Sequence, residues 1–300
     1  RHDLTDAIGG SASCLRARDT LGDVGTEIGT AQETQRLSLH DVLASNFSRV
    51  QQSLRCLEEY GKLLRPDAAS AFESLRYRAY TLERSLVITA MSQSRLADAR
   101  IYVLMDGGPS VSQFQSLAKC LVAAGADVVQ IRDKRLSDRD LLERARLLTG
   151  ITRPAKTLCI VNDRPDIAQL ASADGVHVGQ DELTVRDARA IVDDRMLVGV
   201  STHSLAEARR AVLDGADYIG CGPTFPSRTK HFDDFPGTKF LTDVAREISL
   251  PAFAIGGISL ANLEKVQEAG FQRIAVGTAV TADPDPANAV TQLRENLIDP

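Results

Sequence analysis

The chain from Asp98 onward contains eight short apolar runs, most of them separated by longer amphipathic stretches. The runs cover residues 101–105, 128–131, 157–161, 175–178, 197–200, 218–221, 252–255 and 273–276. Short continuous apolar runs are typical of strands that are buried on both faces, as in parallel sheets. Residues with helical spacing follow most of the runs, for example Leu117, Leu121 and Ala124. Eight such strand–helix units predict a (β/α)8 TIM barrel.

An open, doubly wound sheet is the alternative architecture. Such a sheet often carries a Gly-x-Gly-x-x-Gly turn after its first strand, whereas Asp106, Gly107, Gly108 and Pro109 follow the first run here. The glycines concentrate after the seventh and eighth runs instead. Barrels commonly place a phosphate site there, so we predict the barrel.

The chain before Asp98 has a helical period. Apolar residues recur at spacings of three and four from Leu43 to Leu64, and again from Phe72 to Leu86 after Pro66. The first stripe consists of Leu43, Phe47, Val50, Leu54, Leu57, Tyr60 and Leu64. We predict an all-α domain over residues 1–97, with an antiparallel hairpin of long helices that serves packing or self-association, and a catalytic barrel over residues 98–300. A second active site in the helical domain is the alternative.

Composition excludes several classes of function. The formal net charge is −5, so the chain lacks the basic character typical of nucleic-acid binding. No apolar stretch reaches the roughly 20 residues that span a bilayer, and we expect neither a membrane segment nor a signal peptide, although Arg1 leaves open what precedes it. The five cysteines form no C-x-x-C pair, which predicts free thiols and a reducing cytoplasm.

Polar residues and glycines follow most of the predicted strands, at the end where barrel enzymes place their active sites. In chain order they are Gln130, Arg132 and Lys134; Asn162 and Asp163; Asp181 and Glu182; Ser201; Ser227, Thr229 and Lys230; Gly256 and Gly257; and Gly277 and Thr278. The set combines cations, carboxylates, hydroxyls and glycines, which together predict an anion site built locally on an acidic protein.

The cations Arg132, Lys134 and Lys230 are suited to neutralising a polyphosphate. Asp163, with either Asp181 or Glu182, could hold Mg2+, which prefers oxygen ligands and bridges to substrate phosphates. Backbone N–H groups in the two glycine-containing loops could cradle a separate phosphate monoester. Two phosphate sites in one mouth predict group transfer between two phosphorylated substrates.

Each element has a simpler interpretation when it is taken alone. Asn162 and Asp163 could cap a following helix, and Gly256-Gly257 could be only a tight turn. Arg132 and Lys134 could be a solvated strand end. His177 is predicted to be structural. The joint placement of the set at successive strand ends favours a site.

Six segments make the chain similar to the thiamine-phosphate synthase family over roughly residues 100–297. They are residues 129–134, 161–164, 175–180, 199–203, 218–230 and 254–258, in this order. The resemblance implies a TIM barrel and a Mg2+-dependent reaction. In that reaction a hydroxymethylpyrimidine diphosphate loses diphosphate and its methylene group bonds to the nitrogen of a thiazole phosphate. The family's route is dissociative, through a pyrimidine-stabilised carbocation.

The resemblance also implies roles for individual residues. Gln130 would contact the pyrimidine substrate, Ser201 would lie against the reacting pyrimidine, and Asp163 would ligate Mg2+. The remaining roles concern phosphate groups: Arg132, Lys134, Asn162 and Lys230 would hold the diphosphate, Ser227 and Thr229 would help hold the thiazole phosphate, and Gly257, Gly277 and Thr278 would bind its phosphate.

Three positions depart from the family's pattern. Glu182, preceded by Asp181, stands where a second metal-binding Asp is usual, Ser227 where Thr is common, and Gly277 where a larger apolar residue is common. Two alternatives to the synthase are a thiazole tautomerase of the same barrel family and a non-catalytic sensor of thiamine precursors. Retention of the diphosphate-binding cations favours the synthase.

Overall fold

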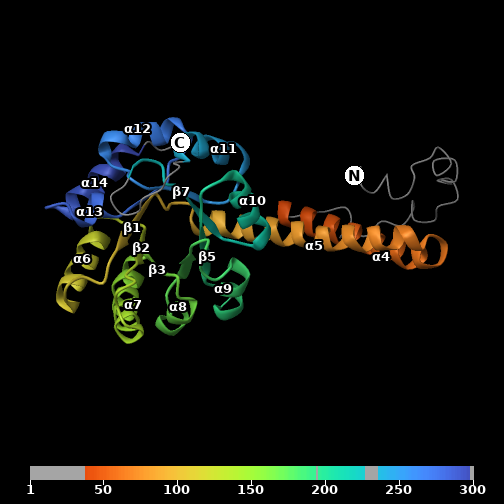
Figure 1. Ribbon diagram of the computed structural model, residues 1–300, viewed down its shortest axis with the longest axis horizontal. Helices are drawn as coiled ribbons and strands as arrows, with labels where there is room; N and C mark the ends of the chain where they lie inside the picture. Colours follow the sequence, from red (N-terminus) through yellow and green to blue (C-terminus); the bar gives the residue numbers. More distant parts are fainter. Residues whose placement is uncertain (1–37, 194, 227–235, 298–300) are drawn as a thin grey trace. The chain divides into compact units, whose positions relative to one another are not determined.

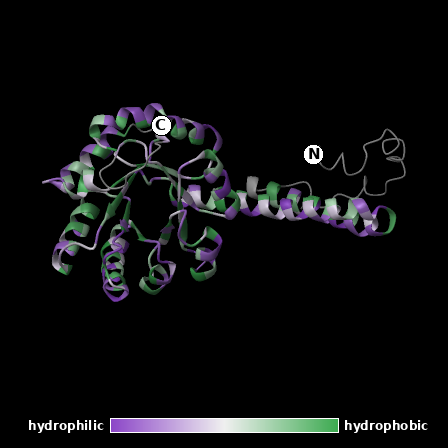
Figure 2. Cartoon of the chain, viewed as in Figure 1, coloured by the Kyte–Doolittle hydropathy of each residue, from purple (hydrophilic) through white to green (hydrophobic). Residues whose placement is uncertain are grey.

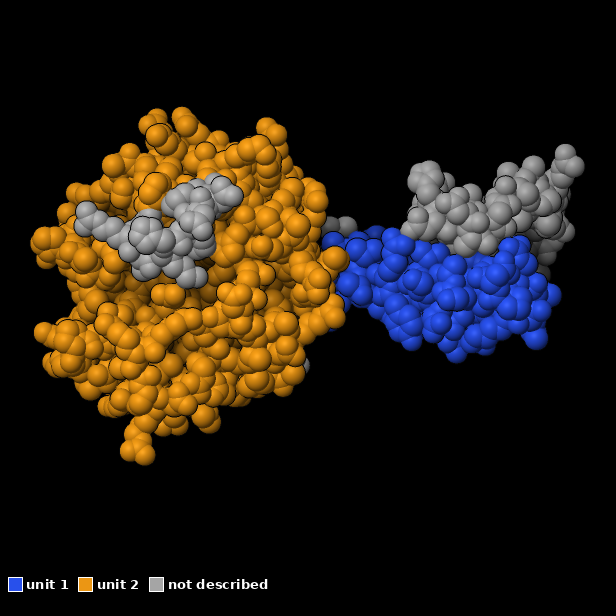
Figure 3. Space-filling model, viewed as in Figure 1, with its two compact units in different colours: residues 1–87 blue, residues 88–300 orange. Residues whose placement is uncertain are grey.

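The computed structural model describes residues 38–193, 195–226 and 236–297. The chain divides into two compact units, residues 1–87 and residues 88–300 (Figure 3). The division falls inside helix α5, which runs from Pro66 to Arg95. The helical sequence pattern predicts the boundary after residue 97 instead, where that pattern ends. Within the described residues, no helix is both long and apolar enough to cross a membrane.

The second unit is the predicted TIM barrel, closed by parallel strands (Figure 1). The strands are β1 (Ile101–Met105), β2 (Val128–Ile131), β3 (Leu158–Asn162), β4 (Gly175–Val178), β5 (Leu197–Thr202), β6 (Tyr218–Cys221), β7 (Ala252–Ile255) and β8 (Ile274–Val276). Each strand pairs with the next, and β8 pairs with β1. Every predicted apolar run is a strand. The largest difference is in β5, which continues through Ser201 and Thr202 rather than ending before them.

Helices that are apolar on one side and polar on the other alternate with the strands (Figure 2). They are α6 (Val111–Ala123), α7 (Asp138–Thr152), α8 (Pro165–Ala171), α9 (Val185–Ile191), α10 (Leu205–Asp214), α11 (Gly237–Glu247), α12 (Leu263–Glu268), α13 (Thr278–Thr281) and α14 (Pro286–Asn296). Short 3-10 turns η2 (Arg153–Ala155) and η3 (Leu260–Asn262) precede β3 and α12.

The strands divide their side chains between two cores, because successive residues of a strand point to opposite faces. On β2 and β3, Val129 and Val161 belong to the large core shared with the helices. Val128 and Ile160 belong instead to the smaller core inside the barrel. The same alternation turns Gln130 inward on β2 and Ser201 inward on β5.

The end of α5 and the residues that follow it close the face of the barrel where the strands begin. Leu96 is 1% exposed and packs in the inner core. The Ser92 hydroxyl donates to Asp217, directly before β6, at 2.8 Å. Residues 88–99 are therefore part of the barrel's own packing, which explains why the second unit begins before the helical pattern ends.

Gly199 on β5 makes room for the ring of Tyr218 on β6. A Cβ atom added at Gly199 would lie 2.1 Å from Cζ of Tyr218. Tyr218 is 2% exposed and packs edge-on against Phe253, with ring centroids 5.8 Å apart. The glycine therefore permits a large aromatic side chain to fill the barrel interior.

The described part of the first unit is an antiparallel pair formed by α4 (Leu39–Leu64) and α5. Leu54, Phe72 and Ala79 are buried between the helices. The hairpin was predicted, but Val50, Tyr60 and Leu64 of the predicted α4 stripe are exposed, which corrects that part of the prediction.

Two other residues of α4 take part in the contact instead. A Cβ atom added at Gly61 would lie 3.3 Å from Cα of Ala69, so this glycine lets the two helices approach closely. Glu58 is buried on the contact face, where it pairs with Arg76 of α5 at 2.9 Å. The contact face of α4 therefore includes small and charged residues that a purely apolar stripe does not reveal.

We predict that Gly199→Ala lowers the free energy of unfolding by about 1–3 kcal/mol, because the added methyl group overpacks the space that Tyr218 fills. Gly150→Ala is the control, since Gly150 lies in α7 with nothing within 4 Å of an added Cβ. This control should leave stability unchanged or raise it slightly. Chemical denaturation measures both variants, and equal stability of the two would contradict the account of Gly199.

Candidate active site

The inward-facing side chains at the carboxyl ends of β2 to β5 form the described mouth of the barrel. Gln130 lies on β2, and Asn162 and Ser201 are part of β3 and β5. Arg132 comes directly after β2, and its backbone N–H donates to Met105 of β1 at 2.9 Å. The structure thus brings residues that are far apart in the sequence to one end of the barrel.

Arg132 is half-buried, and its guanidinium has no hydrogen bond or ion pair with any side chain in the described parts of the chain. Burial of His177, and after it the charge of Arg132, lowers the pKa of His177 to about 4. The carboxylate of Glu182 acts on the same pKa in the opposite direction. Both charges therefore act on the imidazole. A half-buried cation without a carboxylate partner is suited to binding an anionic ligand.

Lys134 joins two carboxylates from neighbouring strand ends. Its ammonium nitrogen lies 3.1 Å from Asp163 Oδ2 and 2.8 Å from Glu182 Oε1. These two partners, Glu182 first, raise the pKa of Lys134. The extended conformation of β2 ends before Lys134, but the long side chain of Lys134 still reaches Asp163 and Glu182 at the neighbouring strand ends.

Asp163 has an unusual backbone conformation, with a φ of 62°. A non-glycine residue in the left-handed region is uncommon and costs free energy, and such residues cluster at functional sites. The helix-capping interpretation of Asn162 and Asp163 is wrong, because Asn162 is the last residue of β3 and Arg164 is the N-cap of α8, with no side-chain cap. The carboxylate of Asp163 is instead directed to Lys134.

The donor set fits Mg2+ as a partner of a phosphorylated substrate. Carboxylate oxygens of Asp163 and Glu182 already converge on one positive charge, and Mg2+ is usually held by one or two carboxylates together with phosphate oxygens and water. The Asp181 side chain is exposed. In the described residues there is no group of three or more His, Cys, Asp and Glu side chains that could hold a metal without a substrate.

Ser201 lies beside His177. The His177 Nε2 atom is 3.0 Å from Ser201 Oγ, and Gln180 donates from its side chain to the Ser201 backbone oxygen. His177 continues on its other side to Tyr218, whose hydroxyl is 3.2 Å from Nδ1. Sequence reasoning did not connect His177 with Ser201, because the two lie on different strands. The alternation of side chains along β4 places His177 on the inner face of the barrel, and this could have indicated that His177 lies near the site.

The loop after β7 supports the start of the loop after β6. Gly256 and Gly257 have φ values of 98° and 65°, and a Cβ at Gly257 would lie 2.6 Å from the Pro226 carbonyl oxygen. The backbone N–H of Phe225 donates to Gly256 O at 2.9 Å. These glycines are therefore required by close packing of the two loops. That packing does not by itself assign them to a phosphate.

Gly277 differs from the pair after β7. It is the N-cap of α13, and a Cβ placed on it would meet its nearest atom, Leu104 O, at 3.8 Å. The fold has room for a larger residue here, so the protein's own packing does not require this glycine. The first N–H groups of α13, beginning with Thr278, have no acceptor within the helix.

Ser227, Thr229 and Lys230, the other predicted phosphate-binding residues, lie outside the described residues.

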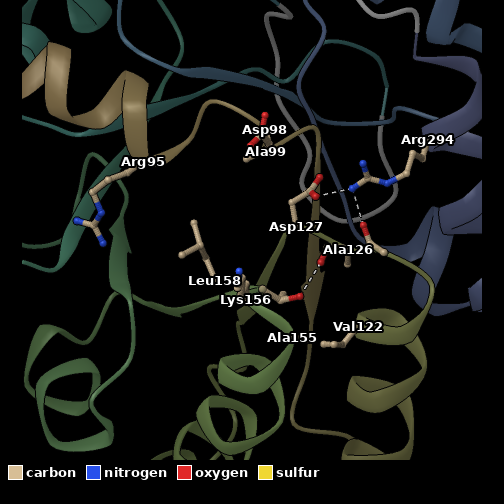
Figure 4. A pocket seen from close by; sticks show the side chains of 12 residues that line it. Arg95, Asp98, Ala99, Val122, Ala126, Asp127, Ala155, Lys156, Leu158 and Arg294 are labelled. Carbon is tan, nitrogen blue, oxygen red and sulfur yellow. Dashed lines mark hydrogen bonds and ion pairs between the residues drawn. The ribbon is translucent and has the colours of Figure 1, made fainter.

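A cavity of about 440 Å3 lies at the opposite face, where β2 and β3 begin (Figure 4). Arg294 on its wall pairs with Asp127 and donates to Gly125 O. The other oxygen of Asp127 accepts from the backbone N–H groups of Arg100 and Ile101, each at 2.8 Å. These charges hold the start of β1 in place, so we assign this cavity a structural role.

Comparison with known proteins gives the family. A protein from Rhodopirellula baltica described as thiamine-phosphate synthase is 43% identical in an alignment 308 positions long, which covers 99% of this chain and 82% of that protein. The chain belongs to the thiamine-phosphate synthase family. A family model described as thiamine monophosphate synthase matches residues 101–280, and a model of the ThiD2 family matches residues 1–85.

Two further relatives support the same family assignment. A thiamine-phosphate synthase from Gloeobacter violaceus is 43% identical over 94% of this chain and 81% of its own length. A solved thiamine phosphate pyrophosphorylase from Pyrococcus furiosus is 31% identical, with a TM-score of 0.58, and covers 66% of this chain and 94% of its own. The closed barrel and the relatives together confirm the predicted fold and family.

Asp133 fixes the synthase's loop between Arg132 and Lys134. Its side chain is 4% exposed and accepts from the backbone N–H groups of Gly107 and Arg135. The Arg135 guanidinium, the largest cause, lowers the pKa of Asp133 to about 2, below its ordinary value of 3.8. Because the folded pKa is the lower one, the contribution of this carboxylate to stability is complete above about pH 4 and is lost as the pH falls through about 2.

We predict that Asp133→Asn destabilises the protein by about 2 kcal/mol at pH 7, because charge-assisted hydrogen bonds are lost. The difference from the unsubstituted protein should shrink between about pH 4 and pH 2, where Asp133 itself becomes protonated. Urea denaturation at several pH values measures this difference. A difference that stays constant over that range would contradict the role of the charge.

Proposed function

We propose that the chain joins hydroxymethylpyrimidine diphosphate to a thiazole phosphate, releasing diphosphate and forming thiamine phosphate. The family assignment supports this reaction for nearly the whole chain. The observation that carries the proposal is the mouth itself. There Arg132, whose guanidinium has no side-chain partner among the described residues, precedes by two positions Lys134, which pairs with Asp163 and Glu182. These groups offer a binding site for a diphosphate and its metal ion on a chain whose net charge is negative.

Loss of diphosphate develops negative charge on the leaving group. The backbone of Arg132 is fixed directly after β2, and its side chain has no carboxylate partner in the described part of the chain. It can therefore stabilise the charge on the leaving group without first breaking an ion pair. Lys134 can bind a phosphate once its carboxylate partners turn to a metal ion. We also assign Asn162 and Lys230 to the diphosphate. Interactions that strengthen as the bond breaks lower the barrier.

Mg2+ bound with the substrate would neutralise phosphate charge, and Asp163 and Glu182 are the residues to hold it. We favour Glu182 over Asp181 as the second ligand, since Glu182 already meets Asp163 at Lys134. The strained backbone of Asp163 holds its carboxylate at the strand end. We expect Asp163 to contribute more to Mg2+ binding than Glu182.

The reacting groups need no general base, because the thiazole nitrogen attacks with its own lone pair. Gln130 and Ser201 would hold the pyrimidine from β2 and β5. Ser227 and Thr229 would help hold the thiazole phosphate, and Gly257, Gly277 and Thr278 its phosphate. The space above Gly277 supports a close approach of that phosphate to the backbone.

The setting of the reaction follows from the same features. We place the protein in the cytoplasm, since its described cysteines are free thiols. Burial raises the pKa of the Cys159 thiol and that of the Cys221 thiol to about 12. We propose a packing or self-association role for the helical unit. Exposed Tyr60, Leu63 and Leu64 near the end of α4 support it.

A turnover assay tests the proposed reaction. Purified protein with both phosphorylated substrates and Mg2+ should release diphosphate and form thiamine phosphate in equal amounts. Arg132→Met should lower kcat by about 100-fold or more, because a preorganised charge is removed from the transition state. Arg146→Met, an exposed arginine on α7, is the matched control and should keep full activity. Absence of diphosphate release by the unsubstituted protein would refute the function.

A magnesium titration of turnover separates the three candidate carboxylates. Asp163→Asn should raise the half-saturating Mg2+ concentration by more than about tenfold, and Glu182→Gln should raise it less. Asp181→Asn should leave it unchanged, because that side chain is exposed. A larger effect of Asp181→Asn than of Glu182→Gln would show that Asp181, and not Glu182, is the second Mg2+ ligand.

A further inference from the structure

A chain of hydrogen bonds crosses the barrel interior beneath the mouth. Gln130 Nε2 donates to the Tyr102 hydroxyl at 2.8 Å, and the hydroxyls of Tyr102 and Tyr218 are 3.1 Å apart. Tyr218 continues to Nδ1 of His177 at 3.2 Å, and Nε2 of His177 to Ser201 Oγ at 3.0 Å. The chain thus links β2, β1, β6, β4 and β5. Both of its ends are residues we assign to the pyrimidine.

The middle of this chain is isolated from water. Tyr102 and Tyr218 are 3% and 2% exposed, and burial raises the pKa of each phenol. Burial, together with Arg132, keeps the imidazole of His177 neutral near pH 7. A neutral imidazole has one donor and one acceptor nitrogen, and a buried hydroxyl that accepts from one neighbour satisfies its proton by donating to the other. Each link therefore determines the direction of the next.

The direction follows from Gln130. With the Gln130 amide assigned so that its nitrogen donates to Tyr102, the Tyr102 hydroxyl donates to Tyr218, which donates to Nδ1 of His177. The proton of His177 is then on Nε2 and points to Ser201 Oγ. The hydroxyl proton of Ser201 is left to donate to another group. At the other end Gln130 Oε1 is buried and has no hydrogen-bond partner in the described structure.

The two ends of the chain therefore offer one acceptor, Gln130 Oε1, and one donor, the Ser201 hydroxyl. An aminopyrimidine presents the complementary pair, since its exocyclic amine donates and its ring nitrogen accepts. An oxopyrimidine presents the reverse pair, because its carbonyl accepts and its ring N–H donates. A buried polar group that is left unpaired costs free energy, so the reversed pair would bind poorly.

We infer that Tyr102, Tyr218 and His177 are positioning residues that make the synthase select an amino-substituted over an oxo-substituted pyrimidine diphosphate. They act by fixing the hydrogen-bond direction at Gln130 and Ser201, and do not themselves touch the reacting atoms. The inference rests on the proposed function and adds to it the origin of substrate selectivity. It also gives a reason for Gly199, which makes the space that the Tyr218 ring occupies.

The test compares kcat/KM for the aminopyrimidine diphosphate with that for its analogue carrying oxygen in place of the exocyclic amine. The unsubstituted synthase should prefer the amino substrate by about 100-fold or more. Tyr218→Phe should lower this preference about tenfold, while KM for the thiazole phosphate changes less than about twofold. Phe253→Leu is the packing control, because its ring contacts both tyrosines but has no polar atom, and it should keep the preference.

A double-variant cycle tests whether the residues act as one chain. Tyr102→Phe alone should also lower the preference, and combining it with Tyr218→Phe should lower it little further, since one break already interrupts the direction. Full additivity of the two losses would overturn the inference. An unchanged preference in Tyr218→Phe, or equal losses for both pyrimidines, would overturn it as well.

Substitutions at His177 decide the question independently, including the case in which the tyrosine variants fail to fold. His177→Gln keeps an N–H group able to donate to Ser201 and should retain most of the preference, whereas His177→Leu should lose it. Equal preference in these two variants would overturn the inference. Failure of the unsubstituted protein to turn over would refute the proposed function instead, so the two failures are distinguishable.

Discussion

The closed barrel depends on one geometric constraint, the alternation of side chains on parallel strands that leave no free edge. Every second residue must enter an interior that only side chains can fill. Near the face where the strands begin, this interior is filled by Leu96, Val128 and Leu158. Towards the mouth the same inward positions carry polar groups. The alternation therefore builds both the core and the site.

The interior is not a uniform apolar core. Tyr102 and Tyr218 bring hydroxyls into it, and each hydroxyl has partners, so the cost of burying them is offset. Gln130 keeps one buried acceptor without a described partner. An unsatisfied buried acceptor at the mouth is costly in the protein alone and becomes favourable when a donor on a ligand reaches it. The site carries a local instability that substrate binding can relieve.

Two cations at the mouth are arranged differently. Lys134 is neutralised by Asp163 and Glu182, whereas Arg132 has no carboxylate partner among the described residues. The first arrangement stores two carboxylates in a position suited to a metal ion, and the second keeps one cation ready for a phosphate. The proposed diphosphate and its metal ion would use both arrangements. A net charge of −5 does not prevent such binding, because the electrostatic field at the mouth is local.

The sequence alone determined the barrel, because each strand is a short continuous apolar run and most helices have an apolar period that is visible within a dozen residues. It also determined which polar residues follow the strands, since chain order places them there. The prediction of buried residues failed on the outer face of α4, where Val50 and Leu64 are exposed. Helical spacing shows which residues lie along one side of a helix, but it does not show which of them contact the neighbouring helix. Only the tertiary structure decided that His177 joins Tyr218 to Ser201, because the register of the closed sheet sets which inward side chains become neighbours. It also decided that Lys134 pairs with both Asp163 and Glu182, because the loops after β3 and β4 lie at the same end of the barrel.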